Sequence, residues 1–102
     1  MNRPIHVACW KGDVATVRTH LENGIDVNIR SLQGGWMPLH FATLWGRVDV
    51  VKLLLEYNAD CDIETEQGYK PLDILSIDLS DMEGVPININ GYNEIRDLLN
   101  PQ

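Results

Sequence analysis

The chain has 102 residues, 44% of them hydrophobic and 23% charged, with a formal net charge of −7. These proportions are those of a folded globular domain and exclude a disordered chain. No stretch approaches the about 18 consecutive apolar residues of a membrane span, and the first residues lack the apolar core of a signal peptide. We therefore expect one cytoplasmic domain over residues 1–102 that makes no use of a membrane.

Proline marks the start of a predicted helix at three places. At the first helical position proline sacrifices no hydrogen bond and presets the backbone angle φ. Gly12 and Gly46 then end the first two of these helices. Each of the two is followed by a second helix with an apolar stripe, such as Val48, Val51, Leu54 and Leu55. The expected pairs are 4–11 with 14–22, 38–45 with 48–56, and 71–77 with 93–99.

The second helices of the first two pairs are expected to end at residues that tolerate the left-handed conformation, Gly24 and Asn58. The stretch 26–34 that follows is polar and contains glycine, which predicts a hairpin projecting sideways. Residues 80–90 interrupt the third pair. We interpret this insertion as part of a terminal cap, with a dedicated binding loop as the alternative.

Charge is unevenly distributed along the chain. Residues 1–59 hold six Lys/Arg and five Asp/Glu, a net of +1, whereas residues 60–102 hold two Lys/Arg and ten Asp/Glu, a net of −8. The acidic half repels phosphate backbones, which argues against nucleic acid as a ligand. The same charge would attract a basic protein partner.

The sequence also repeats itself. Residues 4–14 match residues 38–48 position for position, and the three prolines lie 34 and then 33 residues apart. The Pro-Leu-His-Phe-Ala run at 38–42, with Val51-x-x-Leu54-Leu55 and Asp26-Val27-Asn28, resembles the ankyrin repeat. The resemblance covers residues 3–75 closely and 92–99 loosely. It implies an all-α solenoid of about three stacked helix–turn–helix units with short hairpin loops. The expected units are 1–30, 31–63 and an atypical 64–102.

Two departures from the family pattern predict local differences. The threonine that precedes the proline in the family, and helps to lock the histidine there, is absent, so we expect looser hydrogen bonding at His6 and His40. One residue is inserted before Trp36, which predicts an altered hairpin around the Gly34-Gly35 pair. The residues at the threonine position are Arg3, Met37 and Lys70.

The sequence holds no recognisable catalytic or metal-binding constellation. Equivalent histidines, His6 and His40, would stand one repeat apart, about 10 Å, which is too far to share a metal ion. No catalytic triad, phosphate-binding loop or HExxH motif occurs. Cys9 and Cys61 each stand alone in an apolar neighbourhood, as structural thiols do. We expect a non-enzymatic chain with no cofactor and no metal.

The aromatic residues suggest a binding surface instead. The resemblance implies that the last turn of each first helix and the hairpin tips face the concave, partner-binding side. Trp and Tyr are the residue types enriched at interface hot spots. For Trp36 and Tyr69 an equally good interpretation is that they brace the turn. The candidate partner-binding residues are Trp10, Lys11, Trp36, Leu44, Trp45 and Tyr69, with an acidic margin of Glu64, Glu66 and Asp78.

Three hypotheses for function follow. The first is a monomeric module that binds another protein, possibly a basic one, through the concave groove and hairpin tips. The second is an acidic inhibitor or immunity-type protein that neutralises a basic toxin or enzyme. The third is that the chain is a substrate of asparaginyl hydroxylation at Asn28, since Leu21 and Asp26-Val27-Asn28 resemble the modified sites of animal ankyrin proteins. Asn28 is also explained as a turn-stabilising residue.

Overall fold

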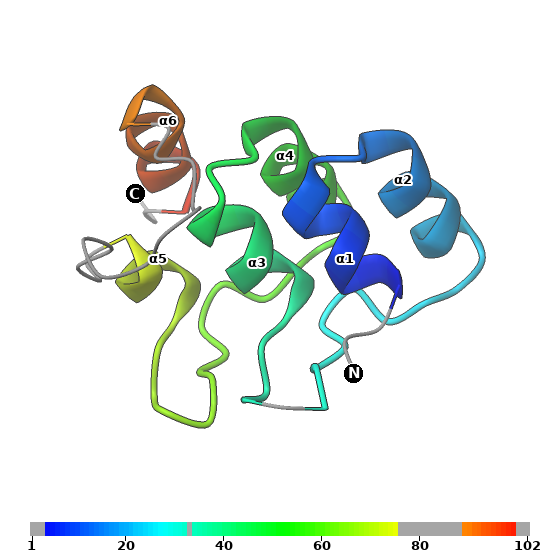
Figure 1. The fold of residues 1–102 in the computed structure, drawn as a ribbon, viewed down its shortest axis with the longest axis horizontal. Helices are drawn as coiled ribbons and strands as arrows, with labels where there is room; N and C mark the ends of the chain where they lie inside the picture. Colours follow the sequence, from blue (N-terminus) through cyan, green and yellow to red (C-terminus); the bar gives the residue numbers. More distant parts are fainter. Residues whose placement is uncertain (1–3, 33, 76–88, 100–102) are drawn as a thin grey trace.

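The structure is a computed structural model that describes residues 4–32, 34–75 and 89–99. These residues form six helices and contain no strand, which confirms the all-α prediction (Figure 1). The helices are α1 (Pro4–Lys11), α2 (Val14–Glu22), α3 (Pro38–Leu44), α4 (Val48–Glu56), α5 (Pro71–Ile74) and α6 (Ile89–Leu99).

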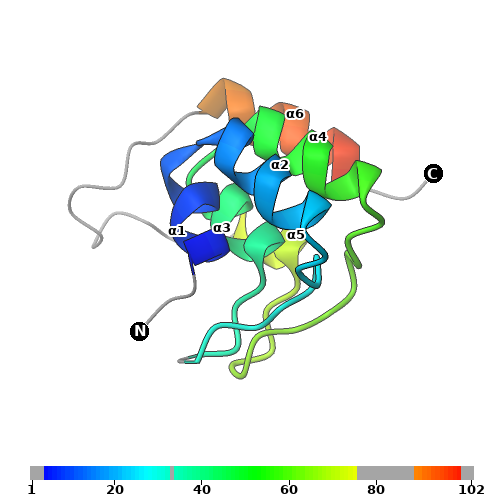
Figure 2. The same ribbon diagram turned by 90° about the vertical axis from the view of Figure 1, so that its right-hand side faces the viewer.

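The helices stack as three antiparallel pairs in two rows. Helices α1, α3 and α5 pack side by side in one row, and α2, α4 and α6 form the second row behind them. The connections between α2 and α3 and between α4 and α5 project from the same side of the stack (Figure 2). Each pair exposes an apolar flank that the next pair covers, which is the packing principle of a solenoid.

The helix limits agree closely with the prediction in the first two units and less well in the third. Helix α3 ends one residue earlier than expected, at Leu44. The regular part of α5 ends at Ile74, and the predicted remainder at 76–77 lies outside the described residues. Helix α6 begins at Ile89, not at residue 93, so the prediction that residues 80–90 are all insertion is wrong at its end. Residues 89–92 contain no proline to stop the helix, and Gly91 is buried in its first turn.

Local signals define the helix ends, and one of them, the Asp13 cap, was not among the predicted ones. Asp13 caps α2, because its carboxylate accepts hydrogen bonds from the Thr16 backbone N–H and hydroxyl at 3.2 and 2.6 Å. These two bonds hold the pKa of Asp13 below its usual value. After α4 the chain turns at Asn58 with φ of +64°, where asparagine takes the left-handed conformation that glycine takes at the equivalent position in the first unit.

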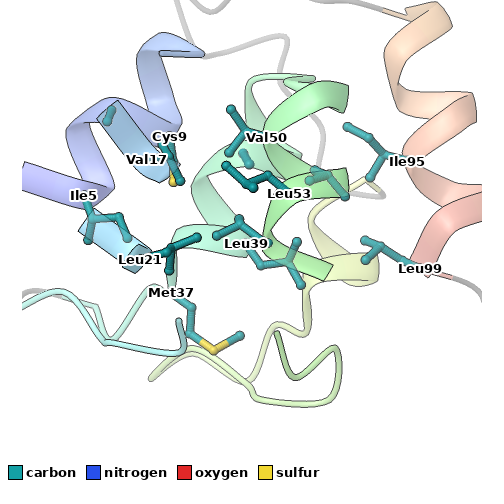
Figure 3. Packing of buried hydrophobic residues seen from close by; sticks show 14 residues of the cluster. Ile5, Cys9, Val17, Leu21, Met37, Leu39, Val50, Leu53, Ile95 and Leu99 are labelled. Carbon is teal, nitrogen blue, oxygen red and sulfur yellow. The ribbon is translucent and has the colours of Figure 1, made fainter. Parts of the chain in front are cut away.

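The core runs continuously through the stack (Figure 3). Helix α4 is its centre, since Val50, Val51, Leu53 and Leu54 are all buried between α2 and α6. On α2 the positions equivalent to Val50 and Leu53 are threonines that face partly or wholly to solvent. The first unit therefore has a polar outer side, as terminal units of solenoids do. The wider cluster also includes Ile5, Cys9, Val17, Leu21, Met37, Leu39, Ile95 and Leu99.

The two hairpins repeat one hydrogen-bonding pattern. The Ser31 N–H donates to the Trp36 carbonyl at 2.8 Å, and the Thr65 N–H donates to the Tyr69 carbonyl at 2.8 Å. The first loop is one residue longer, and it accommodates the extra residue by placing Gly34 and Gly35 in succession at positive φ. The predicted alteration of this hairpin is therefore confirmed.

Candidate protein-interaction surface

The tryptophans at the ends of α1 and α3 meet across the first two units. The ring centroids of Trp10 and Trp45 lie 5.4 Å apart with the planes tilted by 50°. Trp10 is 37% exposed, and Trp45 is half-buried. A tilted aromatic pair of this kind contributes about 0.5–1.5 kcal/mol beyond the area it buries. The pair therefore helps to join the units while it presents indole surface to solvent.

Arg47 fixes the end of α1 beside this pair. Its Nε donates a hydrogen bond to the Trp10 carbonyl at 3.0 Å, so a side chain at the start of α4 holds the last turn of α1. A Cβ on Gly12 would stand 2.9 Å from the Arg47 Cδ, and Gly12 has φ of +76°. Lys11 is exposed next to these residues. An open depression of about 270 Å³ adjoins them, lined by Gly12, Gly46, Arg47, Val48, Asp49 and Val50.

Sequence reasoning missed Arg47. Its position is equivalent to Asp13, which caps α2, but Arg47 makes no such capping bond to α4. A long cationic side chain at a capping position was the available signal. Such a residue has no local partner in the turn and is free to reach a helix carbonyl in the neighbouring unit.

Leu44 does not belong to the exposed surface. Its residue is only 6% exposed, whereas the prediction placed it in an open groove. Helix α3 is packed against α1 on one flank, α5 on the other and α4 behind, so little of its surface remains free. Leu44 contributes to packing, and the prediction for this residue is wrong.

Trp36 and Tyr69 occupy equivalent hairpin positions with different exposure. Trp36 is half-buried, and its ring packs against the rings of His40 and Phe41 at centroid distances of 5.8 and 5.4 Å. Its backbone N–H donates to Ser31 Oγ at 3.0 Å. It therefore braces the turn, as the alternative interpretation held. Tyr69 is 36% exposed, and its backbone N–H donates to Thr65 Oγ1 at 3.2 Å.

The histidines anchor the hairpins to the helices. His40 accepts a hydrogen bond at Nδ1 from the Met37 N–H at 3.0 Å and donates from Nε2 to the Tyr69 carbonyl at 2.9 Å. His6 also holds a hairpin residue, because its Nε2 lies 2.8 Å from the Ile29 carbonyl oxygen. Burial lowers the pKa of His40 to about 4, and the charge of Arg30 acts in the same direction. Both ring nitrogens of His40 are bonded without the family threonine, so the expected loosening is absent at this residue.

The second hairpin presents carboxylates while its backbone is tied to the first. Exposed and covered residues alternate from Ala59 to Glu66. The Glu64 carbonyl accepts from Arg30 Nη2, and the Glu66 N–H donates to the Gly34 carbonyl, both at 2.9 Å. The hairpin backbones are thus joined, and acidic side chains point outward. The exposed carboxylates are Asp60, Asp62, Glu64 and Glu66, whereas the predicted Asp78 lies outside the described residues.

The Asn28 side chain also serves this junction. Its Oδ1 accepts a hydrogen bond from the Asp60 N–H at 2.9 Å, and the residue is half-buried. The side chain of Asn28 therefore joins the two hairpins. The geometry favours the structural interpretation of this residue over the modification hypothesis.

The thiols are those of packing residues. Cys9 is buried, and burial raises its pKa to about 12. Cys61 is half-buried, and its pKa is raised first by burial and then by the neighbouring Asp62 and Asp60. Within the described part of the chain, no three His, Cys, Asp or Glu side chains are grouped to hold a metal ion. None of the described helices is both long enough and apolar enough to cross a membrane.

These features define a helical-repeat protein. Its units are joined through their hairpins, and its first two units carry a pair of indoles at the C-terminal ends of α1 and α3. Residues 2–85 match the family model for ankyrin repeats, which comprises three copies. The chain belongs to the ankyrin-repeat family.

The chain is similar to short segments of several much longer proteins. The chain is 44% identical over 70 residues to mouse 2-5A-dependent ribonuclease, covering 69% of this chain and 10% of that protein. It is 31% identical over 75 residues to mouse protein phosphatase 1 regulatory subunit 12A, covering 74% of this chain and 7% of that protein. It is 29% identical over 73 residues to the mouse inhibitor of Bruton tyrosine kinase, covering 72% of this chain and 5% of that protein.

Proposed function

We propose that the chain is a non-enzymatic module that binds another protein through the partner surface, defined here as Trp10, Lys11, Trp45, Tyr69, Glu64 and Glu66. The single observation that carries this proposal is the Trp10–Trp45 pair, an exposed indole held in place by a second indole and by Arg47. Large rigid aromatic side chains bury much area on binding and lose little conformational entropy. A preorganised pair that spans two neighbouring units is suited to anchoring a partner.

The names of two relatives support a regulatory interaction in place of catalysis. One is a phosphatase regulatory subunit, and another is a kinase inhibitor. Each carries a segment similar to this chain within a much longer protein. The ribonuclease activity named for a third relative is not transferred, because this chain covers only 10% of that protein.

We further propose that the partner is basic where it meets the second hairpin. The exposed carboxylates from Asp60 to Glu66 support this, since the backbone contacts of the hairpins leave these side chains directed to solvent. Charge of one sign at a rim mainly speeds association. An inhibitor that neutralises a basic enzyme or toxin is the sharper form of this proposal.

A capture experiment tests the binding proposal. The full chain, immobilised and exposed to an extract of its source cells, retains proteins that are identified by mass spectrometry and then purified. The proposal expects that Trp10→Ala and Trp45→Ala each reduce binding of the purified partner. Ile25→Ala is the matched control, because Ile25 is an exposed apolar residue of similar exposure, 38%, outside the partner surface. Equal loss in all three variants, or no loss in any, contradicts the proposal.

A further inference from the structure

The partner surface carries opposite charges at its two ends. Lys11 and Arg47 lie beside the Trp10–Trp45 pair, at the ends of α1 and α3. Glu64 and Glu66 lie in the hairpin that precedes α5, on the side where α3 begins. The seven residues of α3 separate these ends by about 10 Å, at 1.5 Å per residue. A bound segment therefore meets two different electrostatic environments.

Arg47 offers a preorganised cationic fork at the tryptophan end. Its Nε is used by the Trp10 carbonyl, and its Nη1 and Nη2 have no hydrogen-bond acceptor among the described residues. Because the Nε bond and the contact with Gly12 hold the side chain, little conformational entropy remains to be lost when a ligand binds. A planar guanidinium presents parallel N–H groups that match a carboxylate.

The nearby carboxylates do not neutralise this fork. Asp13 is engaged by the Thr16 hydroxyl and backbone N–H. Asp49 is exposed in the first turn of α4, where the positive end of the helix dipole favours it. Among the described residues, the ion pair with nitrogen and oxygen closer than 4 Å is Lys52–Glu94, at 3.2 Å between α4 and α6. It does not involve Arg47. The positive charge of Arg47 is thus available to a ligand.

We propose that the partner presents a carboxylate beside a large apolar side chain at this end, with the apolar group against the indoles of Trp10 and Trp45 and the carboxylate on Arg47. This inference rests on the proposed function and specifies its ligand chemistry. Charge complementarity selects the occupant, because a lysine or arginine at the same place would meet Arg47 and Lys11 and be repelled.

Two short synthetic peptides test the proposal directly. The probes are Ac-Asp-Phe-Asp-Leu-NH2 and Ac-Lys-Phe-Lys-Leu-NH2, titrated into the 15N-labelled full chain while the three indole N–H resonances are followed by NMR. The acidic peptide is expected to shift the Trp10 and Trp45 resonances and to leave that of Trp36 in place. The basic peptide is expected to shift neither of the first two. Equal shifts from both peptides, or none from the acidic one, overturn the proposal.

Charge variants separate a direct contact with Arg47 from the general electrostatic potential of the protein. Arg47→Gln is expected to raise the Kd of the acidic peptide roughly three- to tenfold, as the loss of an ordinary net hydrogen bond at a partly exposed site does. The matched control is Arg18→Gln, which removes an exposed cation from α2 and is expected to leave the Kd unchanged. Asp49→Asn keeps the Arg47–Trp10 bond and is expected to lower the Kd. Equal effects of the two arginine variants, or a Kd that rises in Asp49→Asn, contradict the proposal.

The outcome is distinct from that of the capture experiment. If the tryptophan variants abolish binding of the purified partner but the peptides are not discriminated, the ligand chemistry is wrong and the binding function stands. If the tryptophan variants bind the partner normally, the proposed function itself fails.

Discussion

The Nε2 of His40 lies 2.9 Å from the carbonyl oxygen of Tyr69, so a helix of the second unit holds the end of the following hairpin. The ring is neutral in this arrangement, because its Nδ1 accepts a hydrogen bond from the Met37 N–H at 3.0 Å. Protonation adds a hydrogen at Nδ1, which then faces the Met37 N–H donor. The hydrogen bond from Met37 and the burial of the ring that holds the hairpin therefore both depend on the charge of one imidazole.

This dependence predicts a loss of stability in acid. The pKa of His40 is lowered from 6.5 to about 4, so the unfolded chain binds this proton more readily than the folded one. The contribution of the neutral His40 ring to the free energy of unfolding is fully present above about pH 6.5. It is lost as the pH drops toward 4, by at most about 3 kcal/mol. Urea unfolding at pH 4 and pH 7 measures the difference. His40→Gln should flatten the pH dependence of the free energy of unfolding. His20 is half-exposed, and His20→Gln should leave that dependence unchanged. An unchanged slope in His40→Gln would assign the acid sensitivity to other groups.

Leu54 tests the core of the stack. The residue is fully buried in α4, and Leu54→Ala is expected to cost about 2–5 kcal/mol of unfolding free energy. Leu32→Ala is the matched control, because Leu32 is 66% exposed in the first hairpin, and its loss should change stability by less than about 0.5 kcal/mol. Denaturant titration of both variants gives the comparison. Similar values for the two would contradict the placement of Leu54 in the core.

Gly12 tests the packing of Arg47 against the end of α1. A methyl group on Gly12 meets both a positive φ and the Arg47 Cδ at 2.9 Å, whereas Gly24 has φ of +90° and nothing within 4 Å of an added Cβ. Gly24→Ala is expected to cost about 1–2 kcal/mol from the left-handed backbone alone. Gly12→Ala should cost more, because Arg47 must also move. Thermal unfolding of the two variants measures the excess. If Gly24→Ala is the more destabilising, the contact is not significant.

The tryptophan pair separates binding from stability. Trp10→Ala is expected to weaken partner binding by more than about 1 kcal/mol, as hot-spot residues do. Its cost to folding should be moderate, the lost buried area plus about 0.5–1.5 kcal/mol from the ring pair, because the residue is 37% exposed. Trp45→Ala should cost more, since Trp45 is half-buried. Calorimetric titration with the purified partner and melting temperatures provide the two readouts. Unfolding of both variants would place the pair in the core.

The acidic hairpin is expected to act on the association rate. Combined charge reversal at Glu64, Glu66 and Asp78 should slow association with a basic partner and change dissociation little. Raising the salt concentration to about 1 M, where the Debye length falls to about 3 Å, should have the same effect. Stopped-flow kinetics measures both rates, with Glu22→Lys on α2 as the control. Association that ignores both salt and the reversals would leave solubility as the role of these carboxylates.

The sequence alone determined the repeat, the class of fold and most of the helix ends. These features depend on interactions within one turn: proline at a first helical position, and Gly24 and Asn58 in left-handed turns. Such signals act over three or four residues and are therefore visible along the chain. The period of the prolines then showed that the units stack.

Only the tertiary structure decided which of the side chains near the ends of α1 and α3 face solvent. Leu44 is covered because α3 lies between two neighbours, and Arg47 finds its acceptor on Trp10, 37 residues earlier in the chain. A cation at a capping position marks Arg47 in the sequence, but its acceptor and the burial of Leu44 both depend on how far one unit is rotated and shifted against the next. Small displacements between units move a side chain from solvent to core, and packing across the whole stack sets those displacements.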